Sequence, residues 1–121
     1  MDKSECKTVN RQEEISMTEH FDEDGFSAAV ASGVALVDFW ATWCMPCRMV
    51  APVIDKLAED FDGRAVVGKV DVDEQGMLAA RFGIQSIPTV MIFRDGTPVN
   101  TLVGVRDYSE YAAALEEALR A

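Results

Sequence analysis

Residues 40–48 read Trp-Ala-Thr-Trp-Cys-Met-Pro-Cys-Arg and contain two of the three cysteines of the chain. They follow the apolar run 34–40, which is typical of a strand covered on both faces. They precede a stretch, 47–61, whose apolar residues recur at helical spacing. The two thiols, Cys44 and Cys47, are therefore expected where a buried strand gives way to a helix. Two intervening residues on a first helical turn leave the sulfurs within reach of a disulfide.

The position of this pair predicts its chemistry. At a helix N-terminus, unsatisfied amides and the helix dipole favour a thiolate over a thiol at Cys44. A thiolate attacks other disulfides, and Cys47 is placed to resolve the mixed disulfide that results. Pro46 suits an early helical position because the amide that it lacks would have no helical partner. The spacing predicts an accessible redox pair that interconverts between bridged and free forms.

The cysteines allow two other interpretations. A zinc site needs four ligands, and only Cys6 and His20 remain to complete one, neither at ligand-like spacing. Ordinary buried thiols are common in protein cores. The flanking Trp and Pro residues and the strand-to-helix setting make both alternatives less favoured. No metal site is therefore expected.

The rest of the chain alternates between strand-like and helix-like segments. Strands are expected at 18–21, 34–40, 65–72, 89–93 and 99–103, and helices at 22–33, 47–61, 76–82 and 108–119. Pro52 should kink the second helix, and Asp-Gly at 95–96 predicts a hairpin turn. This order predicts an α/β fold, a three-layer α/β/α sandwich with a central mixed sheet of about five strands and four helices.

Composition narrows the class of protein. The 121 residues are enough for one domain, and 11 Lys and Arg against 21 Asp and Glu give a net charge of −10. An acidic surface disfavours nucleic acid and anionic lipid. No apolar run approaches the roughly 20 residues of a membrane-spanning helix. No secretory signal is visible, so a cytoplasmic protein is expected.

The first 17 residues are rich in charge and poor in branched apolar side chains. Such a segment buries too little surface to offset its ordering entropy, so residues 1–17 are expected to be a flexible extension and residues 18–121 the domain. Cys6 lies in the extension. It is interpreted as a bystander, with an intermolecular disulfide or a regulatory thiol as the alternative.

Several segments together resemble the thioredoxin family. They are 37–52 around the cysteines, 69–74, 82–89, the hairpin 94–96 and the Val-Gly pair at 103–104, in family order and spacing over about residues 18–121. The resemblance implies the thioredoxin fold and a thiol–disulfide oxidoreductase that reduces protein disulfides without a bound cofactor. It also implies disulfide-containing protein substrates, a thioredoxin reductase as the recycling partner, and a monomer.

The resemblance also implies roles for single residues. Cys44 would attack and Cys47 resolve, and Asp38, buried beneath the second cysteine, would act as general base and acid beside Lys69. The alternative for Asp38 is an aspartate at a strand end that faces water, and the alternative for Lys69 is a solvated lysine on a strand. Substrates would dock on a surface around the cysteines. Its expected residues are Trp43, Met45, Pro46, Ile87, Pro88 and Gly104.

Three details of that surface stay open on sequence grounds. The resemblance implies a cis bond before Pro88, although a trans proline that starts a strand is the alternative. A turn requirement explains Gly104 almost as well as docking does. For Trp40, core packing and a place on a functional face are about equally favoured.

One departure from the family stands beside the attacking thiol. The commonest motif reads Trp-Cys-Gly-Pro-Cys, and this chain has Met45 in place of Gly, which must alter the contact surface. The retained Pro46 argues against a strongly oxidising member. An oxidase or isomerase of the same fold, a non-catalytic binding module, and a donor dedicated to one enzyme remain the alternative functions.

Overall fold

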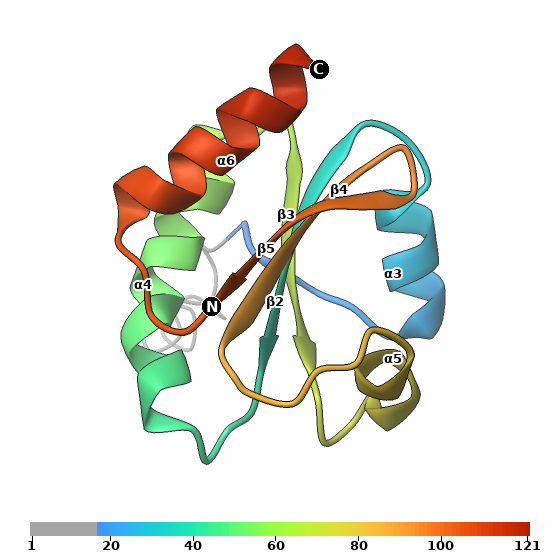
Figure 1. The fold of residues 1–121 in the computed structure, drawn as a ribbon, viewed down its shortest axis with the longest axis vertical. Coiled ribbons are helices and arrows are strands. Elements are labelled where there is room, and N and C mark those ends of the chain that lie inside the picture. Colours follow the sequence, from blue (N-terminus) through green and yellow to red (C-terminus); the bar gives the residue numbers. More distant parts are fainter. Residues whose placement is uncertain (1–16) are drawn as a thin grey trace, which may run out of the picture.

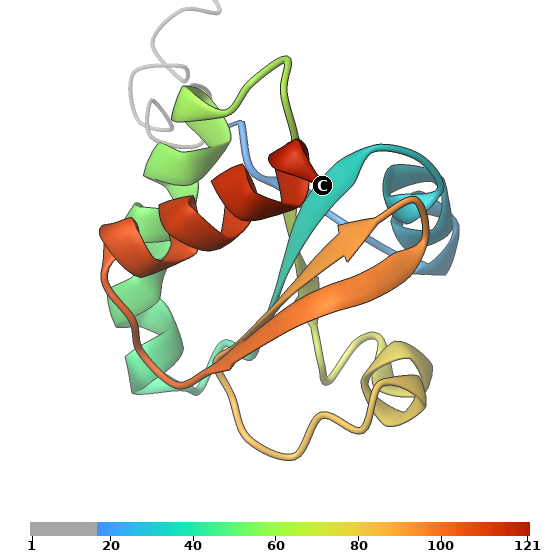
Figure 2. The same cartoon turned by 45° about the horizontal axis from the view of Figure 1, so that its top comes forward.

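A five-stranded sheet lies between two pairs of helices in the computed structural model, which describes residues 17–121 (Figure 1). The strands are β1 (Glu19–His20), β2 (Val34–Trp40), β3 (Val66–Asp71), β4 (Thr89–Arg94) and β5 (Thr97–Val103). The helices are α3 (Glu23–Val30), α4 (Met45–Asp60), α5 (Gly76–Arg81) and α6 (Tyr108–Arg120). Helices α4 and α6 cover one face of the sheet, and α3 and α5 the other (Figure 2). The predicted three-layer fold is confirmed.

The sheet is mixed, with the order β1-β3-β2-β4-β5. Strand β3 pairs in parallel with β1 and β2, whereas β4 runs antiparallel to β2 and β5 antiparallel to β4. Strand β2 is central and buried along nearly its whole length. Its continuous apolar sequence follows from this position, because both of its faces lie under helices.

Side chains of β2 alternate between two cores. Val34 and Leu36 belong to the cluster packed by α4 and α6, whereas Val37 and Phe39 belong to the cluster with α3 and α5. By the same alternation, Asp38 points to the α4 and α6 face. The fold thus brings a carboxyl group into an apolar layer directly under the helix that begins after Cys44.

The hairpin between β4 and β5 has the predicted turn. Asp95 and Gly96 both have positive φ angles, 51° and 87°, as a two-residue type I′ turn requires. The Asp95 carboxylate also accepts a 2.7 Å hydrogen bond from the amide of Gly33, and the Asp95 amide donates to the Gly33 carbonyl. These bonds join the turn to the loop that precedes β2.

The observed boundaries differ from the predicted ones at a few ends. Helix α4 begins at Met45, two residues earlier than predicted, because Cys44 caps it, and it runs through Pro52 to Asp60. Strand β5 begins at Thr97 instead of residue 99, where the Asp-Gly turn ends. The predicted extension, apart from Met17, and Cys6 with it lie outside the described residues. Among residues 17–121, no helix combines the length and apolarity that crossing a membrane requires.

We expect Gly68→Ala to destabilise the fold. A Cβ at Gly68, in β3, would overlap the ring of Phe21 and lie 2.9 Å from the Glu19 carbonyl oxygen. Overpacking of this kind costs about 1–3 kcal/mol of unfolding free energy, measurable by urea denaturation. Gly76→Ala is the control, because a Cβ there meets no atom within 4 Å. Equal stability of the two variants would contradict this account of β1 and β3.

Candidate active site

The two cysteines form a disulfide at the start of α4. Their Cα atoms lie 5.3 Å apart, and the Cys47 amide donates a 3.2 Å hydrogen bond to the Cys44 sulfur, which is therefore the N-cap of the helix. Pro46 occupies the first turn, where no helical acceptor for its missing amide exists. When the pair is reduced, the same amide and the helix dipole stabilise negative charge on Cys44.

The disulfide is less exposed than the sequence suggested. Cys44 is 4% exposed and Cys47 is 2% exposed. Both pack in a small cluster with Ala41, bordered by Trp40 and Ile87. Both cysteine residues are buried, so a reacting partner must fit closely around the disulfide to make contact.

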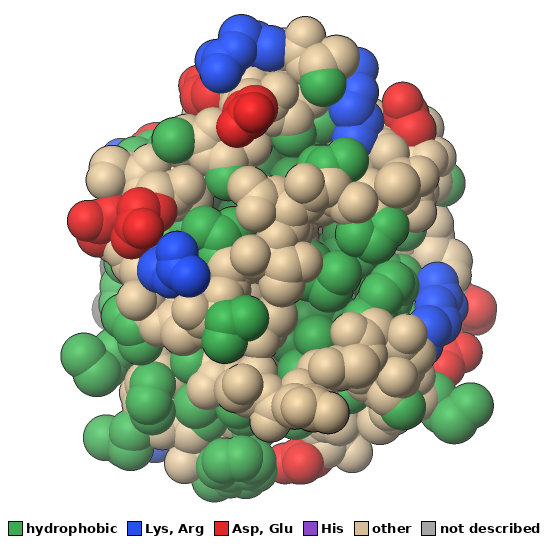
Figure 3. Space-filling view, in the orientation of Figure 1, with side chains coloured by type: hydrophobic (Ala, Val, Ile, Leu, Met, Phe, Trp, Pro, Cys, Tyr) green, Lys and Arg blue, Asp and Glu red, His purple; other side chains and the backbone are tan. Residues whose placement is uncertain are grey.

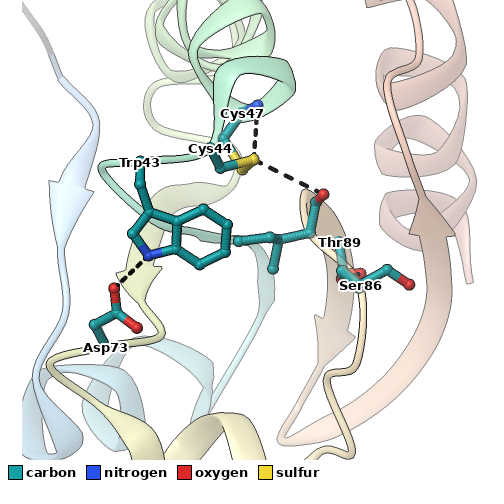
Figure 4. The surroundings of a disulfide bond; sticks show 7 residues. Trp43, Cys44, Cys47, Asp73, Ser86 and Thr89 are labelled. Atoms are coloured by element: carbon teal, nitrogen blue, oxygen red, sulfur yellow. Dashed lines mark hydrogen bonds between the residues drawn. A yellow bond between two sulfur atoms is a disulfide. The ribbon is translucent and has the colours of Figure 1, made fainter.

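A cis peptide bond joins Ile87 and Pro88 beside the disulfide, as the resemblance implied. The Ile87 carbonyl oxygen lies 3.8 Å from the Cys44 sulfur, the contact dashed in Figure 4. A bridged sulfur carries no proton, so this contact becomes a donor–acceptor pair only in the dithiol form. Ile87 is half-buried and Pro88 is buried, so Ile87 is the more exposed of the two. The Gly104 amide donates a 2.9 Å hydrogen bond to the Pro88 carbonyl.

Trp43 stands on the opposite side of the disulfide from Ser86 and Thr89 (Figure 4). Its indole nitrogen donates a 2.7 Å hydrogen bond to the carboxylate of Asp73, which follows β3. This bond orients the side chain of Trp43, which is 67% exposed. Asp73 is a residue that the sequence analysis missed. Its place just after a strand of the parallel part of the sheet was the available signal.

Methionines extend the apolar surface next to Trp43. Met45 and Met49 are 66% and 68% exposed and lie one helical turn apart at the start of α4. Figure 3 shows hydrophobic side chains projecting at this end of the molecule. Pro46 is also exposed, and Gly104 is half-buried. Met49 was missed, although its spacing of four residues from Met45 places both on one helix face.

Asp38 is fully buried, and neither of its carboxylate oxygens accepts a hydrogen bond from the described residues. Desolvation raises the pKa of Asp38 from 3.8 to about 7, because burial penalises the charged form; the positive charge of Lys69 opposes this rise, and the negative charge of Asp55 adds to it. The water-facing alternative for Asp38 is therefore wrong. A carboxyl group with this pKa exchanges protons near neutral pH.

Lys69 lies beside Asp38 in the register of β2 and β3 and is only 9% exposed. Its ammonium nitrogen lies 4.5 Å from the centroid of the Trp40 ring, a cation–π geometry. The solvated-lysine alternative is therefore wrong. Trp40 packs against the cysteine cluster, and its buried indole nitrogen has no hydrogen-bond partner among the described residues.

Asp55 on α4 is a second carboxylate that the sequence analysis did not single out. It accepts a 2.6 Å hydrogen bond from the hydroxyl of Thr18. Asp55 is half-buried. Within residues 17–121, no three His, Cys, Asp or Glu side chains gather as metal ligands would.

Comparisons with known proteins agree with this geometry. The family model for thioredoxin matches residues 16–117. A curated thioredoxin from Staphylococcus haemolyticus is 48% identical over 97 residues, which cover 80% of this chain and 93% of the relative. A thioredoxin from Staphylococcus aureus is 49% identical over 94 residues, which cover 78% and 90%.

This chain belongs to the thioredoxin family. It has the thioredoxin fold, and with its Cys44–Cys47 disulfide it is a thiol–disulfide oxidoreductase that reduces protein disulfides. The solved structure of a mutant thioredoxin from Halobacterium salinarum matches at a TM-score of 0.79 and 35% identity, covering 84% of this chain and 90% of that one. A thioredoxin from Malassezia sympodialis matches at 0.76 and 36% identity, covering 86% and 92%.

The buried carboxyl should make the stability of this thioredoxin depend on pH. The pKa of Asp38 is about 7 in the folded protein, against 3.8 for an exposed Asp. The folded state therefore holds the proton more tightly, and unfolding free energy falls as pH rises from about 4 to about 7. Asp38→Ala should remove this fall, and its stability relative to the native chain should rise by up to about 4 kcal/mol between pH 4 and pH 8.

Urea denaturation across this pH range measures the effect. Asp62→Ala is the control, because Asp62 is an exposed aspartate that follows α4. If the difference between Asp38→Ala and the native chain stays constant from pH 4 to pH 8, Asp38 is ionised in the folded protein and the proposed electrostatics are wrong.

Proposed function

We propose that Cys44 is the attacking thiol of this oxidoreductase and that Cys47 resolves the mixed disulfide. The observation that carries the proposal is the hydrogen bond from the Cys47 amide to the Cys44 sulfur, 3.2 Å long, at the N-terminus of α4. This contact favours the thiolate at Cys44, and Cys47 is slightly the less exposed residue, at 2% against 4%. The asymmetry supports attack by the first cysteine and resolution by the second.

The reaction consists of two exchanges. The Cys44 thiolate attacks one sulfur of the target disulfide, forms a mixed disulfide and expels the other target sulfur as a thiolate. Cys47 then loses its proton and attacks the Cys44 sulfur, which releases the second target thiol and closes the Cys44–Cys47 disulfide. The target gains two electrons from the enzyme pair; of the two protons that its thiols need, one is released by Cys47 and the other comes from solvent.

Asp38 is proposed to accept the proton of Cys47 in the second exchange. Its support is the buried carboxyl, on the sheet face under α4, with a pKa of about 7. Lys69 is proposed to limit the rise in the pKa of Asp38, because its positive charge favours the ionised carboxylate. Both groups would act without touching the target protein.

The docking surface is proposed to surround Cys44. An extended target segment would pair with the backbone beside the cis Ile87–Pro88 bond, as in strand addition. Exposed apolar side chains on the α4 side would contact the flanking target residues. The proposed docking residues are Trp43, Met45, Pro46, Ile87, Pro88 and Gly104.

We further propose that the protein is a cytoplasmic monomer and that residues 18–121 form its domain. Its disulfide would be reduced again by a thioredoxin reductase, and its target disulfides would lie in other proteins. The match to thioredoxins over residues 16–117 supports these assignments. No bound cofactor is needed, because both electrons reside on the cysteine pair.

Reduction of insulin in the presence of dithiothreitol tests the proposed roles. The native chain should accelerate it, and Cys44→Ser should abolish the acceleration because the attacking thiolate is gone. In a separate reaction without dithiothreitol, the reduced Cys47→Ser variant should accumulate a mixed disulfide with insulin through Cys44, detected as an added mass that later addition of dithiothreitol removes. A mixed disulfide trapped by Cys44→Ser instead would reverse the two roles. A midpoint potential near that of oxidising relatives would overturn the direction of electron flow.

Met45 should contribute to protein docking. Met45→Ala removes an exposed apolar side chain beside Cys44, so we expect KM for a protein disulfide to rise about threefold to tenfold, in line with lost apolar contact. The rate with a small aromatic disulfide should stay unchanged. Met77→Ala is the control, since Met77 is 76% exposed on α5 and is not among the docking residues. Equal KM values for the two variants would remove Met45 from the docking surface.

A further inference from the structure

A tyrosine hydroxyl on α6 holds the loop that carries Gly104. Tyr111 is fully buried in the core between α4, α6 and the sheet. Its hydroxyl accepts a 3.2 Å hydrogen bond from the Arg106 amide and donates a 3.4 Å hydrogen bond to the Gly104 carbonyl. One side chain thus binds two backbone groups of the segment between β5 and α6.

The same loop is bound on its other side to the segment beside the disulfide. The Gly104 amide donates to the Pro88 carbonyl at 2.9 Å, and the carbonyl of the preceding residue, Ile87, lies 3.8 Å from the Cys44 sulfur. Gly104 has a φ of 87°, so the loop reverses its path at this residue. Hydrogen bonds therefore connect the Tyr111 hydroxyl through Gly104 to the edge where a target segment would pair.

The hydroxyl is not explained by packing. The Tyr111 ring lies among apolar side chains, where a leucine or phenylalanine would fill space without a polar atom. A buried hydroxyl costs free energy unless it is hydrogen-bonded, and here both of its bonds go to the loop. Burial raises the pKa of Tyr111 above its usual value, so the group remains a hydrogen-bond donor at neutral pH.

We propose that Tyr111 is a positioning residue for substrate docking, because its hydroxyl holds the Gly104 loop against the Pro88 segment in the geometry that a target protein recognises. This inference rests on the proposed function of the surface around Cys44. Tyr111 does not touch the target or the cysteines. It acts by keeping the docking edge ordered before a target arrives, which lowers the cost of binding.

The other tyrosine of the chain supplies a matched control. The Tyr108 hydroxyl donates a 2.6 Å hydrogen bond to the carboxylate of Asp60, and so joins α6 to the far end of α4. Tyr108→Phe removes one hydroxyl and its hydrogen bond from the same helix, without altering the Gly104 loop. Tyr108→Phe therefore shows the effect of losing a tyrosine hydroxyl from α6 when the Gly104 loop keeps its hydrogen bonds.

Steady-state reduction of insulin by the full chain tests the proposal. Tyr111→Phe removes both hydrogen bonds between the hydroxyl and the loop, so it should raise KM about fivefold to tenfold, with kcat changed less than about twofold. The rate with a small aromatic disulfide and the midpoint potential should stay unchanged, because neither depends on the docking edge. Amide hydrogen exchange at Gly104 and Arg106 should accelerate in this variant and not in Tyr108→Phe.

Each other result counts against the proposal. An unchanged KM for Tyr111→Phe would show that docking does not need the hydroxyl. Equal losses with insulin and the small disulfide would place the effect at the cysteine pair instead of the docking edge. Tyr111→Leu, which also lacks a hydroxyl, should reproduce the rise in KM if Tyr111→Phe folds poorly. Failure of the native chain and of Tyr108→Phe to reduce insulin would contradict the proposed function itself.

Discussion

The site depends on one hydrogen bond, from the Cys47 amide to the Cys44 sulfur, 3.2 Å long. This bond makes a cysteine side chain the N-cap of a long helix. The same contact gives the first turn of α4 a hydrogen-bond acceptor and gives the Cys44 thiolate a hydrogen-bond donor. A serine could cap the helix equally well but could not exchange disulfides. The redox pair is therefore part of how the helix begins.

The layers of the fold place two further requirements around this helix end. Strand β2 carries Asp38 into the apolar layer beneath α4, where desolvation keeps its pKa near 7. Ile87, which a cis bond joins to Pro88, has its carbonyl oxygen 3.8 Å from the Cys44 sulfur. Helix α4 thus lies over a buried carboxyl group, and the disulfide at its start lies beside the outer edge at which targets are proposed to pair. The Tyr111 hydroxyl adds a support for the outer edge, from α6.

Much of this arrangement is predictable from local pattern. Short segments of the sequence predict the alternation of strands and helices, the Asp-Gly turn and the position of the cysteines at a helix start. Their periodicity and turn residues are compatible with few local structures. The resemblance to the thioredoxin family added the cis bond before Pro88. Predictions missed contacts that join distant segments through ordinary residue types: Asp73 on Trp43, Thr18 on Asp55, and the Tyr111 hydroxyl on the Gly104 loop. No periodicity distinguishes these residues from surface acids or core aromatics.

The sequence by itself determined the fold class and the redox pair, because the order of strand-like and helix-like segments indicates the first, and residues at one strand end and one helix start indicate the second. Only the tertiary structure decided how buried the cysteines are, which second carboxylate acts on Asp38, and which side chain holds the Gly104 loop. The physical reason is that desolvation and long-range hydrogen bonds depend on what packs from other elements. Asp55 and Lys69 lie 17 and 31 residues after Asp38 along the chain, and only folding brings them near it.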